Sequence, residues 1–197
     1  PSIDIHHKTS PDQLLDRLFE LYEFCSIEAN KMKKKIIFEI GTEEQSGGNN
    51  TKEELNYILQ KTKNFCNKNH YDEPTFVVVQ TGTKVMETKN IGTFDSPLRV
   101  VNEVPAEIQV PIMVEVCNEN NILMKQHNTD YLSDEALKWH PRFGIHAANV
   151  APEFGVVETR ALLEVLKVNK LFHLIEEFLE LSFKSKKWDK WMLKDSN

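Results

Sequence analysis

The stretch TFVVVQ at residues 75–80 decides the fold class. It is almost entirely β-branched or aromatic, and a short apolar run of this kind is typical of a strand that is buried on both faces. Strands of that type belong to parallel sheets whose faces are covered by helices. The stretch therefore predicts an α/β protein in which residues 75–80 form a central strand.

Strand-like and helical segments alternate on both sides of this stretch. The other strands are expected at residues 3–8, 36–40, 122–127 and 143–150, and the helices at 11–32, 51–67, from Asp134 onward, 152–167 and 171–183. Residues 84–111 are the least regular part and are expected to hold a loop and one interrupted helix. Because each helix returns the chain to the same edge, the strands should run parallel, either in an open doubly wound sheet or in a barrel.

Two features of the sequence bear on the choice between an open sheet and a barrel, namely its lack of nucleotide-binding motifs and its number of β/α units. No Gly-x-Gly-x-x-Gly follows the first expected strand and no phosphate loop with Gly-Lys-Ser/Thr occurs, so a nucleotide cofactor loses support. The five expected β/α units are also three short of a barrel of eight. We expect residues 1–184 to form one α/β unit and residues 185–197 to form a polar tail that carries Trp188 and Trp191.

The composition is that of an ordinary soluble protein. Of the 197 residues, 40 % are hydrophobic and 27 % are charged, and the net charge is −6, without the clustered basic excess that a nucleic-acid partner requires. No apolar run approaches the roughly 20 residues that span a membrane. Cys25, Cys66 and Cys117 lie in apolar periodic segments and are expected to be buried thiols, which favours a reducing, cytoplasmic location.

Polar side chains follow each expected strand at its carboxyl end. These residues are His6, His7 and Lys8 after the first strand, Glu43 after the second, Gln80 and Thr81 after the third, His127 and Asp130 after the fourth, and His146 and Asn149 on the fifth. Because the carboxyl ends of parallel strands meet at one edge, we expect these side chains to converge on a single site.

The mixture of imidazole and carboxylate groups suits a divalent metal, zinc or manganese, with one open position. His127 and Glu43 are the expected ligands, together with His6 or His7, which point to opposite faces of their strand. No His-Glu-x-x-His or Cys-x-x-Cys motif supports the metal directly. The alternative for Glu43 is a loop or helix-dipole charge.

Five short motifs occur in a recognisable order. They are Gly41-Thr42-Glu43 followed by Gly47-Gly48, then Val79-Gln80-x-Gly82, His127-x-Thr129-Asp130-Tyr131, Val150-x-Pro152, and Arg160-Ala161-Leu162. Over residues 3–167 the chain resembles the Z subunit of class II tagatose-bisphosphate aldolase, and the His-x-Thr-Asp-Tyr motif is the most specific element. The resemblance implies that the parallel β/α units form the second half of a (β/α)8 barrel.

The resemblance also implies a role in carbohydrate metabolism on a sugar phosphate, with a catalytic aldolase subunit as partner. Some relatives of this type look like metal-dependent C4 epimerases of hexulose 6-phosphates, and a third alternative is a purely accessory subunit. The segment His6-His7-Lys8 and the segment from His146 to Asn149 depart from the family pattern, so the sugar is expected to differ. An isolated half barrel would expose an open edge and an apolar face, which favours an oligomer.

Aldol cleavage and C4 epimerisation both require a polarised C2 carbonyl so that the C3–C4 bond can break to an enediolate. A metal acts as the Lewis acid, while a side chain takes and returns the proton of the C4 hydroxyl. The catalytic residues are expected to be Asp130, as the acid/base, with His127 and Glu43. The substrate contacts are expected from Gln80, Thr81, Asn149 and Lys8.

Overall fold

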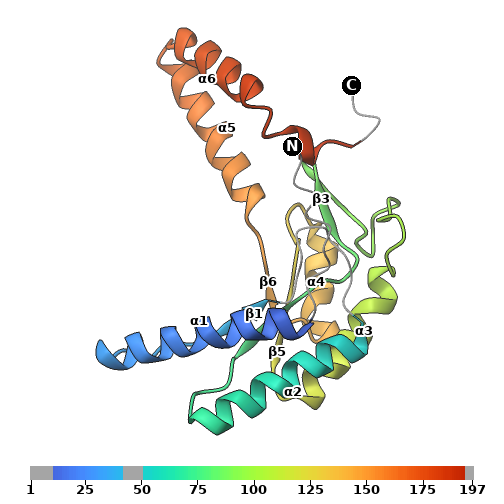
Figure 1. Ribbon diagram of the computed structural model, residues 1–197. Helices are drawn as coiled ribbons and strands as arrows, with labels where there is room; N and C mark the ends of the chain where they lie inside the picture. The colour runs from blue at the N-terminus through green and yellow to red at the C-terminus, as the bar shows by residue number, and fades with distance from the viewer. Residues whose placement is uncertain (1–10, 42–50, 194–197) are drawn as a thin grey trace, which may run out of the picture.

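A computed structural model of the protein describes residues 11–41 and 51–193 (Figure 1). Over these residues the chain is an α/β protein with one four-stranded parallel sheet and six α-helices. The sheet strands are β1 (Glu39–Gly41), β2 (Phe76–Val79), β5 (Leu123–Gln126) and β6 (Ala147–Ala148), in that spatial order. In a doubly wound sheet the strand order reverses at a switch point. The four described strands instead follow one another in chain order, without such a reversal. The strand expected at residues 3–8 lies outside the described residues.

Six α-helices are described, and the first four pack on one another in chain order, whereas the last two pack on each other. The helices are α1 (Pro11–Lys31), α2 (Lys52–Asn69), α3 (Ala106–Glu119), α4 (Asp134–Phe143), α5 (Pro152–Val168) and α6 (Phe172–Ser185). Helix α1 packs on α2, α2 on α3, and α3 on α4. The predicted start of α2 is confirmed, because the Thr51 hydroxyl accepts the N–H of Glu54 at 3.1 Å and the Glu54 carboxylate accepts the N–H of Thr51 at 3.2 Å.

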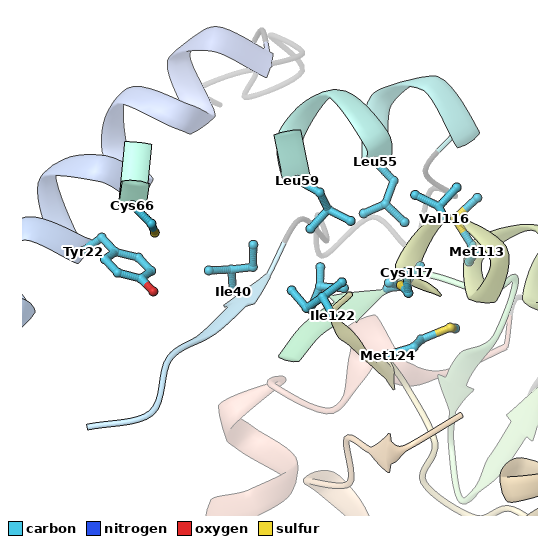
Figure 2. Close-up of a cluster of buried hydrophobic side chains, with 12 residues drawn as sticks. Tyr22, Ile40, Leu55, Leu59, Cys66, Met113, Val116, Cys117, Ile122 and Met124 are labelled. Carbon is cyan, nitrogen blue, oxygen red and sulfur yellow. The ribbon is translucent and has the colours of Figure 1, made fainter. Parts of the chain in front are cut away.

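The hydrophobic core lies between the sheet and these helices (Figure 2). One row of paired strand residues, Ile40, Val77 and Met124, points toward the helices. Helix α2 supplies Leu55 and Leu59, four positions apart and therefore on one helical face. The other buried members of the cluster are Tyr22, Cys66, Val79, Met113, Val116, Cys117 and Ile122. Because side chains alternate between the two faces along each strand, one face of the sheet packs against the core.

The opposite face of the sheet carries charge. Glu39 on β1 and Lys125 on β5 flank the residues that face the core, so both point the other way. Lys125 Nζ lies 2.9 Å from Glu39 Oε2, across the intervening strand β2. The two opposite charges therefore pair on the face of the sheet that points away from the core.

A hairpin that the sequence did not predict follows β2. Strands β3 (Lys84–Met86) and β4 (Lys89–Ile91) pair antiparallel within the segment that was expected to be irregular. Two glycines fix this segment in place. Gly82 and Gly92 have φ of +74° and +83°, and a Cβ on Gly92 would lie 1.9 Å from the Gly82 carbonyl oxygen. Any larger residue at Gly92 would push the two backbones apart.

Some sequence predictions need correction. The strand expected at residues 143–150 is reduced to β6, because Phe143 still belongs to α4 and Gly144, with φ of +78°, ends that helix. The strand expected at 36–40 is shifted to β1. The prediction of three buried thiols was wrong for Cys25, which is exposed, and right for Cys66 and Cys117.

Helices α5 and α6 project from the rest of the molecule as a hairpin (Figure 1). Neither helix has a fully buried residue, and Phe154 and Phe183 are 68 % and 70 % exposed. After α6 the chain returns toward β3 through a 3-10 helix, η1 (Asp189–Trp191), and the N–H of Glu87 donates to the Trp191 carbonyl at 2.7 Å. Among the described helices none is both long and apolar enough to cross a membrane.

Candidate functional site

A cavity of about 370 Å³ lies beyond the carboxyl ends of β5 and β6. The loop after β5 contributes His127, Asn128 and Asp130, the segment from β6 into α5 contributes Asn149, Ala151 and Pro152, the hairpin contributes Lys84 and Val85, and η1 contributes Lys190 and Trp191. Three predicted site residues, His127, Asp130 and Asn149, are therefore brought together. Their position at the carboxyl edge is where parallel α/β proteins bind ligands.

His127 is held by backbone and side-chain contacts. Its N–H donates to the Val79 carbonyl at 3.0 Å, and its own carbonyl accepts from the Thr83 hydroxyl at 3.0 Å. The amide nitrogen of Gln80 lies 2.7 Å from Nδ1 of the imidazole. With the Gln80 amide nitrogen in this position, a neutral imidazole accepts at Nδ1 and carries its proton on Nε2, so the contact depends on that tautomer. In that tautomer the imidazole donates from Nε2.

Asp130 is buried at the start of helix α5. Its Oδ1 accepts the N–H of Ala151 at 2.9 Å and the N–H of Glu153 at 2.8 Å. In return, the Glu153 carboxylate accepts the N–H of Tyr131 at 2.8 Å. Asp130 therefore caps α5 and is stabilised by the positive end of the helix dipole. This structural role exists beside the predicted acid/base role, which stays a prediction.

The loop that carries these residues is held by hydrogen bonds from the β3–β4 hairpin. Asn90 on β4 donates to the carbonyls of Asn128 and Asp130, at 2.7 and 2.8 Å. Asn128 and Tyr131 both have positive φ, 51° and 58°, in the left-handed region that asparagine tolerates better than tyrosine. A loop with so many fixed points presents His127 and Asp130 in a defined geometry.

Asn149 is joined to the same loop through its backbone. Its carbonyl accepts from the Thr129 hydroxyl at 2.9 Å, and its N–H donates to the Gln126 carbonyl at 2.9 Å. These contacts use only the main-chain groups of Asn149, and the residue lines the cavity. Its predicted contact with a sugar hydroxyl is therefore compatible with its position.

Gln80 and Thr81 take positions behind the cavity. Both are fully buried and neither is among the described residues that line the cavity. Gln80 contacts His127, and the Thr81 hydroxyl accepts from the Gln126 amide at 2.6 Å. In this structure they position other side chains, and a direct contact of either with a substrate stays a prediction.

The environment of the loop also affects Tyr131. Burial, and then the negative charges of Asp130 and Glu153, raise the pKa of the Tyr131 hydroxyl above its usual value. The hydroxyl therefore stays protonated over the physiological range.

The other predicted site residues, His6, His7, Lys8 and Glu43, lie outside the described residues. Within residues 11–41 and 51–193, no three His, Cys, Asp or Glu side chains gather in a group that could hold a metal ion. The described donors alone therefore do not fit a zinc or manganese site, which commonly uses three protein ligands.

The sequence did not predict four polar or aromatic lining residues, which are Lys84, Asn128, Lys190 and Trp191. Lys84 lies on the unexpected hairpin. Lys190 and Trp191 lie in the tail, and no local pattern indicates that the tail folds back. Asn128 could have been found, because an asparagine directly after a strand residue is a common site of positive φ.

Comparison with models of known protein families finds no match, and comparison with curated proteins finds no significant match. Function therefore has to be argued from the cavity and its residues.

Proposed function

We propose that this protein binds a phosphorylated ketose in the cavity and promotes breakage and re-formation of its C3–C4 bond. Such chemistry belongs to a carbohydrate-metabolism protein similar to the Z subunit of tagatose-bisphosphate aldolase, or to a sugar-phosphate C4 epimerase. The observation that carries the proposal is the convergence of His127, Asp130 and Asn149 on one cavity. His127 and Asp130 come from the loop after β5, and Asn149 comes from the segment directly after β6, the neighbouring parallel strand.

The proposal includes a (β/α)8 barrel of which this chain supplies the second half. The order β1-β2-β5-β6 supports it, because consecutive neighbours are what a barrel requires. The ion pair between Glu39 and Lys125 also supports it, because their face of the sheet would point into the barrel. A cytoplasmic location and an oligomeric state remain part of the proposal.

The chemistry proposed for this chain uses its own side chains. His127 donates from Nε2 to the ketose carbonyl oxygen and stabilises negative charge there as the C3–C4 bond breaks. The carboxylate of Asp130 takes the C4 hydroxyl proton and later returns it. Asn149 orients the sugar hydroxyls. The proposed zinc or manganese ion would require ligands beyond the described residues, such as Glu43 and either His6 or His7.

The test follows fructose 6-phosphate, tagatose 6-phosphate and tagatose 1,6-bisphosphate by carbon NMR, with manganese or zinc supplied. We expect a C4 epimer or triose products with the wild-type chain and none with His127→Ala. His173→Ala is the matched control, because His173 is exposed on α6 and does not line the cavity. If His127→Ala turns over at the wild-type rate, His127 has no catalytic role.

An accessory role is the second candidate, and the α5–α6 hairpin favours it. Large apolar side chains are exposed along both helices, namely Phe154, Val157, Leu162, Val165, Val168, Phe172, Leu179, Leu181 and Phe183. Extended apolar surfaces of this kind mark protein–protein contacts. In this case the chain stabilises a catalytic aldolase subunit. Co-purification of that subunit, without turnover of any of the three sugars by the chain alone, would favour the accessory role.

A further inference from the structure

The cavity has two ammonium groups at its mouth that the proposed chemistry does not use. Lys84 stands at the start of β3, and Lys190 stands in η1 at the other end of the chain. Both line the cavity together with His127. Their convergence depends on the backbone hydrogen bond from Glu87 to Trp191, which joins the tail to the hairpin at 2.7 Å.

Neither lysine is neutralised by a described neighbour. Every described lysine or arginine within 4.0 Å of a carboxylate belongs to another pair, and the hairpin's own ion pair joins Lys89 to Glu87 at 3.9 Å. Lys190 is instead held over the ring of Trp191, with Nζ 4.8 Å from the ring centroid. A cation–π contact fixes the ammonium without cancelling its charge.

The acidic residue among the described lining residues is Asp130, and it forms no ion pair with either lysine. Its Oδ1 accepts two N–H groups at the start of α5, from Ala151 and Glu153. Those two N–H groups are therefore already used, although a helix N-terminus is otherwise a site that attracts anions. Lys84 and Lys190 are the cationic side chains of the described lining.

We propose that Lys84 and Lys190 form a binding pair for a phosphate monoester, and that the tail residues 186–193 form one wall of the site. The inference rests on the proposed function, because it assigns the end of the cavity that holds the phosphate of the ketose. The sugar then extends toward His127 and Asn149. A cavity of about 370 Å³ is at the small end of ligand sites, as suits a single sugar phosphate.

The experiment measures binding by calorimetry with three probes: fructose 6-phosphate, inorganic phosphate and unphosphorylated fructose. The variants are Lys84→Gln and Lys190→Gln. The controls are Lys89→Gln, on the neighbouring strand of the hairpin, and Lys187→Gln, in the same tail; both remove one positive charge, and neither residue lines the cavity. Circular dichroism checks that all four variants fold.

Each cavity variant should bind fructose 6-phosphate and inorganic phosphate with an affinity roughly three- to tenfold lower than wild type. Loss of one solvent-accessible charged hydrogen bond predicts an effect of this size. The controls should bind like wild type, and fructose should bind equally to all proteins. The proposed phosphate-binding role of Lys84 and Lys190 is overturned if the wild-type chain does not bind phosphate or if the cavity variants bind it like wild type. It is also overturned if the control variants lose as much affinity for phosphate as the cavity variants.

The failure of this inference can be told apart from failure of the proposed function. Phosphate binding that depends on the two lysines, without conversion of any ketose phosphate, supports the pair and removes the proposed reaction. Conversion with the same KM in wild type and in both lysine variants supports the reaction and overturns the pair.

Discussion

The amide nitrogen of Gln80, a fully buried residue directly after β2, lies 2.7 Å from Nδ1 of His127, and as the donor in this contact it favours the proton on Nε2 of a neutral ring. The hydroxyl of the next residue, Thr81, accepts from the side-chain amide of Gln126 on β5 at 2.6 Å. Two neighbouring strands thus meet through paired polar side chains directly behind the site.

Replacing Gln80 with Glu should reverse the tautomer of His127. A carboxylate only accepts, so Nδ1 must carry the proton and Nε2 loses its ability to donate. Nitrogen-15 NMR of the imidazole measures this directly, with Nε2–H expected in wild type and Nδ1–H in Gln80→Glu. Turnover should fall by about a hundredfold if His127 acts as a proton donor. Gln126→Glu, also buried, is the matched control and should leave the tautomer unchanged; a wild-type ring protonated on Nδ1 would contradict the assignment.

Asp130→Asn and Asp130→Ala separate the capping role of Asp130 from its acid/base role. Asparagine keeps an oxygen for the N–H groups of Ala151 and Glu153, so its cost in unfolding free energy should be small, whereas alanine should cost about 0.5–2 kcal/mol. Both variants should lose activity by about 10²–10⁴-fold if the carboxylate transfers a proton. Urea unfolding and the NMR turnover assay measure the two effects. An active Asp130→Asn protein would leave Asp130 with the capping role alone.

His140 should make the chain less stable in mild acid. The side chain is buried in helix α4, and burial lowers the pKa of its imidazole below the usual value of 6.5. The unfolded chain therefore takes up a proton that the folded chain resists, so this contribution is fully present above about pH 6.5 and is lost as the pH falls toward the folded-state pKa.

The measurement is the urea midpoint of wild type and of His140→Phe at pH 7.5 and pH 5.5. The difference between the two proteins isolates His140 from the other histidines. Wild type should lose more stability than the variant between the two pH values. An equal loss in both proteins would show that His140 does not contribute.

The three cysteines should differ sharply in reactivity. Cys66 and Cys117 are buried, and burial raises the pKa of the Cys117 thiol to about 12, so its thiolate is scarce. Cys25 is exposed on α1. Titration with Ellman's reagent should therefore detect one thiol in the folded chain and three after denaturation. Rapid reaction of a second thiol in the folded chain would mean that the core around α2 and α3 opens readily.

The elements that could be predicted are those whose signals are local. The capping box at Thr51 and Glu54 and the proline at the start of α5 both mark helix starts in the sequence alone. The run of valines in β2 marks its burial. Each of these features depends on residues within a few positions of one another.

The β3–β4 hairpin escaped prediction because its turn lacks the usual residues. Glu87 and Thr88 connect the two strands, and Glu87 takes φ of 54° without glycine, asparagine or aspartate to indicate it. The return of Trp191 to the hairpin was missed for a different reason. It depends on one long-range backbone contact, which leaves no pattern in the local sequence. The sequence therefore did not predict the part of the cavity wall formed by Lys84, Val85, Lys190 and Trp191.

The distribution of the cavity wall along the chain affects when the site forms during synthesis. Lys84 and Trp191 are more than one hundred residues apart, and His127 and Asn149 lie between them. At ribosomal rates, roughly 5–20 s pass between the emergence of the first and last wall residues. All residues of the core cluster precede Trp191 in the chain, so the core can form before the cavity wall is complete. Ligand binding in the cavity would therefore require the chain as far as Trp191, whereas protection of the core would not.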